Sequence, residues 1–116
     1  MDMRVLIVDD NAAFLHAASS LLERQGMTVA GTATNAAEGL RVVEVLRPDV
    51  VLVDVFLGQE SGFDLARRLA AGGWAVILIS THDELELSEL IAASPAGGFL
   101  SKADLSADAV RRVAAA

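Results

Sequence analysis

Short apolar runs alternate along this chain with longer segments in which apolar residues recur every three or four positions. Each run is far shorter than the roughly 20 residues that cross a membrane. Apolar runs bounded by polar residues are typical of strands buried on both faces, as in a parallel sheet covered by helices. The expected strands are residues 4–8, 27–31, 50–53, 75–79 and 98–100.

The segments between these runs have the periodicity and the end signals of amphipathic helices. Asp10 and Asn11 offer N-cap chemistry for the first helix, and Asn35 offers it for the second. Gly26 and Pro48 end these two helices, because neither residue type continues a helix well. The expected helices are residues 11 to about 24, 35–48 with both end signals included, about 63–71, 85–93 and 105–113. The first helix is expected to bury Phe14, Ala17, Ala18, Leu21 and Leu22, and the second Ala36, Leu40, Val43 and Leu46.

Five strands alternating with five helices predict a single α/β domain over residues 1–116. The expected fold is flavodoxin-like: a doubly wound five-stranded parallel sheet, order 2-1-3-4-5, with helices on both faces. A chain of 116 residues is long enough for one such domain and too short for two.

Composition and charge narrow the partners and the compartment that suit this domain. The net charge of −7 argues against direct nucleic-acid binding, because phosphate backbones attract basic surfaces. With no cysteine, the chain has neither a disulfide framework nor a thiolate metal site. No signal peptide and no apolar segment of membrane length is visible, so we expect a cytoplasmic location without membrane contact.

Three carboxylates come at the ends of two predicted strands. Asp9 and Asp10 follow the first strand, and Asp54 follows the third. In a sheet of this order, ligands bind beyond the carboxyl ends of strands one and three, where the winding direction switches. Like charges gathered there raise one another's pKa values unless a cation lies among them. Mg²⁺ is the cation that we expect, because it binds a few carboxylates and completes its shell with water and phosphate oxygens.

Two more polar residues are expected at the same rim. Ser80 ends the fourth strand, and Lys102 follows the fifth. A lysine can pair with an aspartate and with a phosphoryl oxygen, and phosphoryl transfer depends mainly on such positioning and charge neutralisation. A carboxylate can also act as the nucleophile and form an acyl phosphate. Asp54, at the end of a buried central strand, is the natural candidate for this role.

Four segments of the chain resemble the receiver domain of two-component response regulators, and the resemblance covers essentially the whole length. They are VLIVDDN with its acidic pair, VVLVDVFLGQESG with the phosphoacceptor and the closing Gly62, VILIST, and GGFLSKADL. Each motif is weak by itself. Together, in this order and at these strand ends, they identify the family.

The resemblance implies a phosphorelay function that is not classical enzyme catalysis. Asp54 would accept a phosphoryl group from a phosphohistidine on a sensor histidine kinase or a histidine phosphotransfer protein, and the domain would assist its own phosphorylation and dephosphorylation. Asp10 and Asp54 would bind Mg²⁺ directly and Asp9 partly through water. The backbone carbonyl of Phe56 would complete the protein ligands.

The resemblance also assigns a switch that changes a protein-interaction surface. Ser80 would be the switch hydroxyl, Phe99 the switch aromatic residue, and Lys102 the lysine that neutralises phosphoryl charge. Homodimerisation on phosphorylation is one expected output. Phe56 is apolar and cannot orient a hydrolytic water, which predicts slow self-dephosphorylation unless His82 compensates.

Each of these residues also has a simpler interpretation. Asp9 and Asp10 suit a helix cap, Ser80 a cap of the fourth helix, Lys102 a solvated loop and Phe99 the core. Three other functions share the fold or the chemistry. A pseudo-receiver would keep the fold without phosphorylation, a haloacid dehalogenase-type phosphohydrolase would need an aspartate at position 56, and a flavin carrier would need a hydroxyl-rich loop after the first strand.

Overall fold

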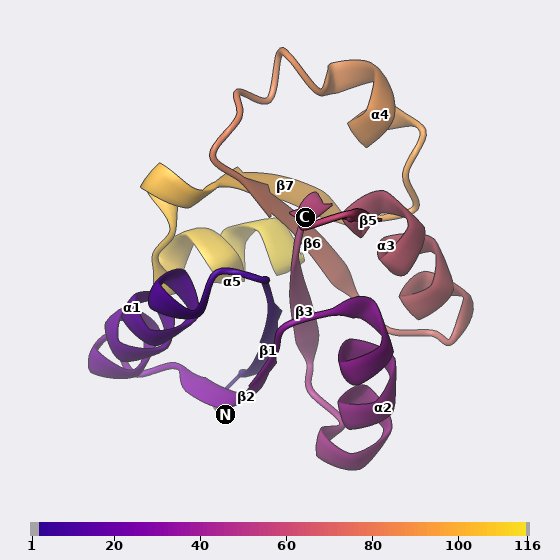
Figure 1. Ribbon diagram of the computed structural model, residues 1–116. Coiled ribbons are helices and arrows are strands. Elements are labelled where there is room, and N and C mark those ends of the chain that lie inside the picture. The colour runs from indigo at the N-terminus through magenta and orange to yellow at the C-terminus, as the bar shows by residue number, and fades with distance from the viewer. Residues whose placement is uncertain (1–2, 116) are drawn as a thin grey trace.

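Five parallel strands form the centre of the molecule (Figure 1). The computed structural model describes residues 3–115. The strands of this sheet are β1 (Arg4–Val8), β2 (Thr28–Ala33), β3 (Val50–Asp54), β6 (Val76–Ser80) and β7 (Gly98–Ser101). Their order is β2-β1-β3-β6-β7, and every neighbouring pair is parallel. Numbered along the chain within this sheet, the order is 2-1-3-4-5, as predicted.

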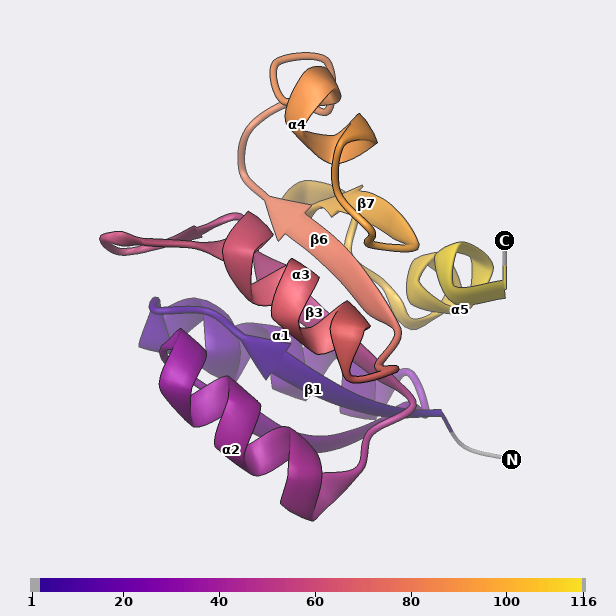
Figure 2. The ribbon, with the colours of Figure 1, turned by 90° about the vertical axis from the view of Figure 1, so that its right-hand side faces the viewer.

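Helices cover both faces of the sheet, so the chain is doubly wound. Helices α1 (Ala12–Arg24) and α5 (Ala107–Ala115) lie on one face, and α2 (Ala36–Leu46) and α3 (Gly62–Ala71) lie on the other (Figures 1 and 2). The short helix α4 (Ser88–Ala92) belongs to the connection between β6 and β7. Within residues 3–115, none of the helices has the length and apolar character needed to cross a membrane.

The side chains of each central strand alternate between two hydrophobic cores, one on each face of the sheet. In β1, Leu6 and Val8 join the core under α2 and α3, whereas Val5 and Ile7 join the core under α1 and α5. Successive side chains of a strand point to opposite faces, so a strand between two helical layers is apolar at every position. All four side chains are fully buried. The continuous apolar runs therefore identified these strands correctly.

The buried face of α1 differs from the predicted one. Ala18 and Leu22 are buried as expected, but Ala17 is exposed and Leu15 is buried in its place. Residues 15, 18 and 22 follow the three- and four-residue spacing of one helical face, and residue 17 lies outside that face. The N-cap is Asn11, whose side chain accepts a hydrogen bond from the backbone N–H of Phe14 at 3.1 Å.

Helix α4 is shorter than the predicted helix over residues 85–93. Leu87 is buried against the core of α2 and α3, whereas Leu85 is 85% exposed. Two apolar residues at a spacing of two do not share a helical face. The segment before Ser88 therefore forms turns, and the regular helix begins only there.

Helix α5 begins two residues later than predicted. Residues Lys102–Asp104 form a short 3₁₀ helix, η1, directly after β7. The hydroxyl of Ser106 then accepts a hydrogen bond from the backbone N–H of Ala109 at 3.0 Å. This side-chain cap places the first turn of α5 at Ala107.

A two-stranded hairpin follows β3 where the sequence predicted only a loop. It pairs β4 (Phe56–Leu57) with β5 (Glu60–Ser61). Gly58 allows the turn, since its φ of +63° is in the left-handed region. The carboxylate of Glu60 accepts a hydrogen bond from the backbone N–H of Ala36 at 3.1 Å, which ties the hairpin to the first turn of α2.

Candidate functional site

The three predicted carboxylates meet at the carboxyl ends of β1 and β3. One oxygen from each of Asp9, Asp10 and Asp54 can be chosen so that all three lie within 4.8 Å of one another. The helices after β1 and β3 cover opposite faces of the sheet, so this corner is the switch point of the winding. The predicted gathering of these residues is confirmed.

Backbone hydrogen bonds hold the two buried carboxylates in place. The backbone N–H of Asp9 donates to the carbonyl of Ala33 at 3.0 Å, and one carboxylate oxygen of Asp9 accepts from the N–H of Asn11 at 2.8 Å. The Asp54 Oδ1 atom accepts from the N–H of Phe56 at 3.2 Å. Asp9 and Asp54 are buried, whereas Asp10 is exposed at the rim.

Lys102 brings a positive charge between the two buried carboxylates. Its Nζ atom lies 2.6 Å from Asp9 Oδ2 and 3.3 Å from Asp54 Oδ2. It also lies 4.2 Å from the centre of the Phe14 ring, a cation–π distance. Three carboxylates and one ammonium group leave a net negative charge, so a further cation is favoured in this corner.

Burial raises the pKa of Asp54 above its ordinary value of 3.8. The negative charge of Asp9 raises the pKa further, while the charge of Lys102 and the N–H of Phe56 lower it. The net direction is upward because desolvation is the largest cause. The corner therefore holds Asp54 in an environment that disfavours its unneutralised negative charge.

The residues of this corner fit Mg²⁺. Asp9 Oδ2 is buried and lies 2.6 Å from the Lys102 ammonium group, so this oxygen already binds a cation. A carboxylate oxygen that attracts an ammonium group can also attract a metal cation. The donor set consists of oxygens only, which is the set that Mg²⁺ prefers.

Glycines shape the loop that carries Asp54. The N–H of Gly62 donates to the carbonyl of Val55 at 2.9 Å, so the start of α3 lies directly against the end of β3. A Cβ atom at Gly62 would lie only 1.9 Å from the carbonyl oxygen of Asp54. At Gly58 a Cβ atom would approach Asp10 Oδ2 to 3.4 Å, in addition to the strain of a positive φ.

Ser80 reaches the same edge of the sheet, but its hydroxyl is directed to its own loop. Ser80 is buried at the end of β6, beside β3. Its Oγ atom accepts a hydrogen bond from the backbone N–H of His82 at 3.0 Å and lies 3.5 Å from His82 Nδ1. Phe99 on β7 is partly buried against the core of α2 and α3. The switch roles of Ser80 and Phe99 remain predictions.

Phe56 lies beside His82, and Phe14 has a contact that the sequence did not predict. The Phe56 side chain is 47% exposed, and its ring centre lies 4.9 Å from that of His82. The role of its backbone carbonyl as a metal ligand remains a prediction. The sequence assigned Phe14 only to the core, yet Phe14 also packs under Lys102. Its position in the first turn after the Asn11 cap was the available signal, because that turn begins at the carboxyl edge of β1.

Fold and corner together place the chain in the class of CheY-like α/β domains of the flavodoxin type. A family model described as the response regulator receiver domain matches residues 5–113. The chain therefore belongs to the receiver-domain family of two-component signalling, as its motifs predicted.

Individual relatives agree with this assignment. The uncharacterized transcriptional regulatory protein YvfU of Bacillus subtilis is 34% identical over 116 residues, which cover 95% of this chain and 58% of that protein. The solved signal receiver domain of a modulated diguanylate cyclase from Desulfovibrio desulfuricans G20 is 33% identical. It has a TM-score of 0.81 and covers 97% of this chain and 90% of that one. A CheY-like response regulator receiver domain protein from Methanospirillum hungatei JF-1 is 27% identical, with a TM-score of 0.79 and coverages of 97% and 91%.

The curated relatives are longer than this chain. The chain matches 27% of the length of a protein-glutamate methylesterase/protein-glutamine glutaminase of Koribacter versatilis, to which it is 34% identical over 99 residues, or 84% of the chain. It matches 58% of the length of YvfU. The chain spans less than two thirds of either relative, so the activities of those whole proteins are not assigned to it.

Proposed function

We propose that Asp54 is a phosphoacceptor, which takes a phosphoryl group from a phosphohistidine on a sensor kinase or a histidine phosphotransfer protein. The observation that carries this proposal is the position of the Asp54 carboxylate, 3.3 Å from the only lysine of the chain and beside two further carboxylates at the switch point. A carboxylate nucleophile with an ammonium group next to it suits phosphoryl transfer, which depends on positioning and charge neutralisation.

The reaction exchanges one bond to phosphorus for another. A carboxylate oxygen of Asp54 attacks the phosphorus atom, and an acyl phosphate forms as the bond between phosphorus and the histidine nitrogen breaks. The leaving nitrogen keeps the electron pair and takes a proton from solvent. The N–H of Phe56, bonded to Asp54 Oδ1, fixes the orientation of the carboxylate, so Oδ2 is the oxygen that attacks.

Lys102 stabilises the charge that arrives with the phosphoryl group. Its Nζ atom already contacts both buried carboxylates, so a small shift pairs it with a phosphoryl oxygen without loss of its contact to Asp9. The face of the Phe14 ring contacts the ammonium group and stabilises its position through a cation–π interaction. A charge held in place before the reaction lowers the barrier because little reorganisation is needed.

Asp9, Asp10, Asp54 and the backbone carbonyl of Phe56 would hold Mg²⁺, as the oxygen-only donor set supports. When bound, Mg²⁺ supplies neutralisation of the carboxylate and phosphoryl charges. The residues of the chain provide the geometry around it. Asp9 is fixed by its bond to the N–H of Asn11, and the close approach of Gly62 fixes the backbone of Asp54.

Phosphorylation would then change an interaction surface through Ser80 and Phe99. A phosphoryl group on Asp54 offers acceptor oxygens beside β6, and the Ser80 hydroxyl can turn toward them. Phe99 lies on the neighbouring strand β7 and is only partly buried, so it has room to repack. We infer that the surface of α4, β7 and α5 is the one that changes, and that a second copy of the domain is one possible partner.

Phosphorylation in vitro tests the proposal. The protein is incubated with acetyl phosphate with and without Mg²⁺, and its intact mass is measured. We expect one phosphoryl group on the wild type only with Mg²⁺, and none on Asp54→Asn. Asp108→Asn is the matched control, because the Asp108 side chain is 89% exposed on α5. Equal labelling of Asp54→Asn and wild type would refute the assignment.

A further inference from the structure

A chain of contacts connects the loop after Asp54 with the hydroxyl of Ser80. Phe56 follows Asp54 by two residues, and its ring packs on the imidazole of His82 with a centre-to-centre distance of 4.9 Å and an interplanar angle of 57°. His82 in turn contacts the Ser80 hydroxyl through its backbone N–H at 3.0 Å and through Nδ1 at 3.5 Å. Both hydrogen bonds of Ser80 Oγ within the described residues are therefore with one residue.

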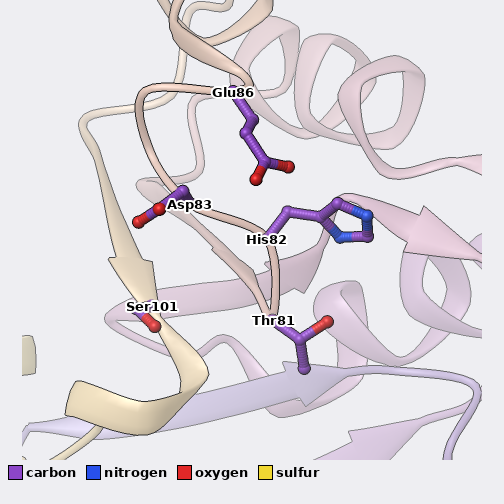
Figure 3. Close-up of a pocket in the computed structure, with 5 residues that line it drawn as sticks. All are labelled: Thr81, His82, Asp83, Glu86 and Ser101. Carbon is purple, nitrogen blue, oxygen red and sulfur yellow. The ribbon is translucent and has the colours of Figure 1, made fainter.

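The His82 ring points toward a neighbour outside its own loop, and this neighbour holds it in place. Figure 3 shows the imidazole pointing away from Ser101 and β7, on the other side of its loop. Phe56 lies on that side, in the hairpin after β3. Without this aromatic contact, the loop after β6 would have few apolar anchors near His82, since residues 81–86 are all exposed. Tilted aromatic pairs of this kind stabilise a structure by more than the burial of their apolar area alone.

We propose that Phe56 and His82 are positioning residues that hold the Ser80 hydroxyl away from Asp54 until the domain is phosphorylated. The N–H of His82 occupies the hydroxyl oxygen of Ser80, and the Phe56 ring keeps His82 where it can do so. The Ser80 O–H would donate to a phosphoryl oxygen on Asp54, and to reach it Ser80 Oγ must turn away from the His82 N–H from which it accepts. This inference rests on the proposed function and adds the residues that set the energetic threshold of the switch.

The proposal makes a specific distinction between two substitutions of His82. His82→Ala removes the ring and with it the anchor on Phe56, so the loop is released. Both variants keep the backbone N–H of residue 82, but His82→Phe also keeps an aromatic ring on Phe56, so the loop stays in place and Ser80 should still be held. A merely general effect of altering this loop would not separate the two variants.

Binding of beryllofluoride, an analogue of the phosphoryl group, measures the threshold in the presence of Mg²⁺. We expect His82→Ala to bind beryllofluoride about five-fold more tightly than wild type, because release of the loop moves the N–H of residue 82 away from Ser80 and one ordinary hydrogen bond is worth about this factor. His82→Phe should bind like wild type, and so should His16→Ala, which alters the other histidine of the chain on the exposed side of α1. In a Ser80→Ala background, His82→Ala should have no effect. Equal affinities of wild type and His82→Ala, or the same gain in the Ser80→Ala background, would overturn the proposal.

Hydrogen exchange of the unmodified protein separates this proposal from the proposed function. The His82 amide should exchange about five-fold faster in Ser80→Ala than in wild type, because its acceptor is lost. Unchanged exchange would overturn the proposal even if beryllofluoride binds. Failure of the wild type to bind beryllofluoride, together with faster exchange in Ser80→Ala, would instead refute the phosphoacceptor function and leave the hydrogen bond confirmed.

Discussion

Replacement of Lys102 by methionine removes the positive charge that separates two buried carboxylates. The Lys102 side chain is 12% exposed, and those of Asp9 and Asp54 are 0% and 9% exposed. Methionine has nearly the same volume, so the change is mainly one of charge. Without Lys102, Asp9 and Asp54 face each other in the absence of a cation, and the pKa of Asp54 loses one of the effects that lower it.

The size of the effect follows from this burial. Removing one partner of a buried ion pair costs about 3–5 kcal/mol, because a charge is left buried without compensation. For a domain of this size a loss of about 1 kcal/mol lowers the unfolding midpoint by roughly 4 °C, so a decrease of roughly 12–20 °C is expected. Arg67→Met is the control, since Arg67 and Asp64 form an exposed ion pair whose loss should cost less than about 1 kcal/mol.

Thermal and urea unfolding at pH 7, with and without Mg²⁺, measure the prediction. Mg²⁺ should stabilise Lys102→Met more than wild type, because binding to the folded state adds stability and the variant corner is more negative. The difference between the proteins should shrink as the pH falls through the raised pKa of Asp54, because the protonated carboxyl no longer needs a cation beside it. A Lys102→Met variant within about 1 kcal/mol of wild type at pH 7 without Mg²⁺ would refute the electrostatic account of this corner.

Three further predictions concern the same corner. Asp54→Asn should raise the unfolding midpoint at pH 7. A raised pKa means that the folded state binds the proton of Asp54 more tightly than the unfolded state does. The carboxyl therefore lowers the stability of the fold as the pH rises from 3.8 through its folded pKa, and asparagine removes that loss. Urea titrations at pH 3 and pH 7 check the sign. Gly62→Ala should cost about 3 kcal/mol or more, because its Cβ meets the backbone of Asp54, whereas Gly73→Ala should cost only about 1–2 kcal/mol for its positive φ, as urea unfolding would show. Phe56→Asn should speed hydrolysis of the acyl phosphate by about five-fold, since an amide can orient a water, and a decay rate equal to or below that of wild type would contradict this.

The strands and the acidic corner could be predicted because simple geometry determines them. A strand buried on both faces must be apolar at every position, and β1, β3 and β6 are the clearest runs of this kind. Carboxyl ends of neighbouring parallel strands share one edge of the sheet, so Asp9 and Asp54 had to meet once the strand order was known. Lys102 follows β7 at the same edge and contacts Asp54 across β6, which lies between β7 and β3.

The loops could not be predicted because they depend on single contacts with distant parts of the chain and on single side-chain torsions. The hairpin after Asp54 depends on Gly58 and on a hydrogen bond from the Ala36 N–H to Glu60, two residues 24 positions apart. The short α4 depends on Leu87 turning into the core, which a count of apolar residues does not show. The orientation of the Ser80 hydroxyl is a side-chain torsion with no periodic signal in the sequence.

Identification of the modified residue tests the central claim most directly. After incubation with Mg²⁺ and acetyl phosphate, borohydride reduction converts an aspartyl phosphate to homoserine, which peptide mass spectrometry locates. We expect homoserine at position 54 and nowhere else, with its formation abolished by EDTA. Homoserine at position 9 or 10, or an unmodified Asp54 under these conditions, would contradict the account of this corner.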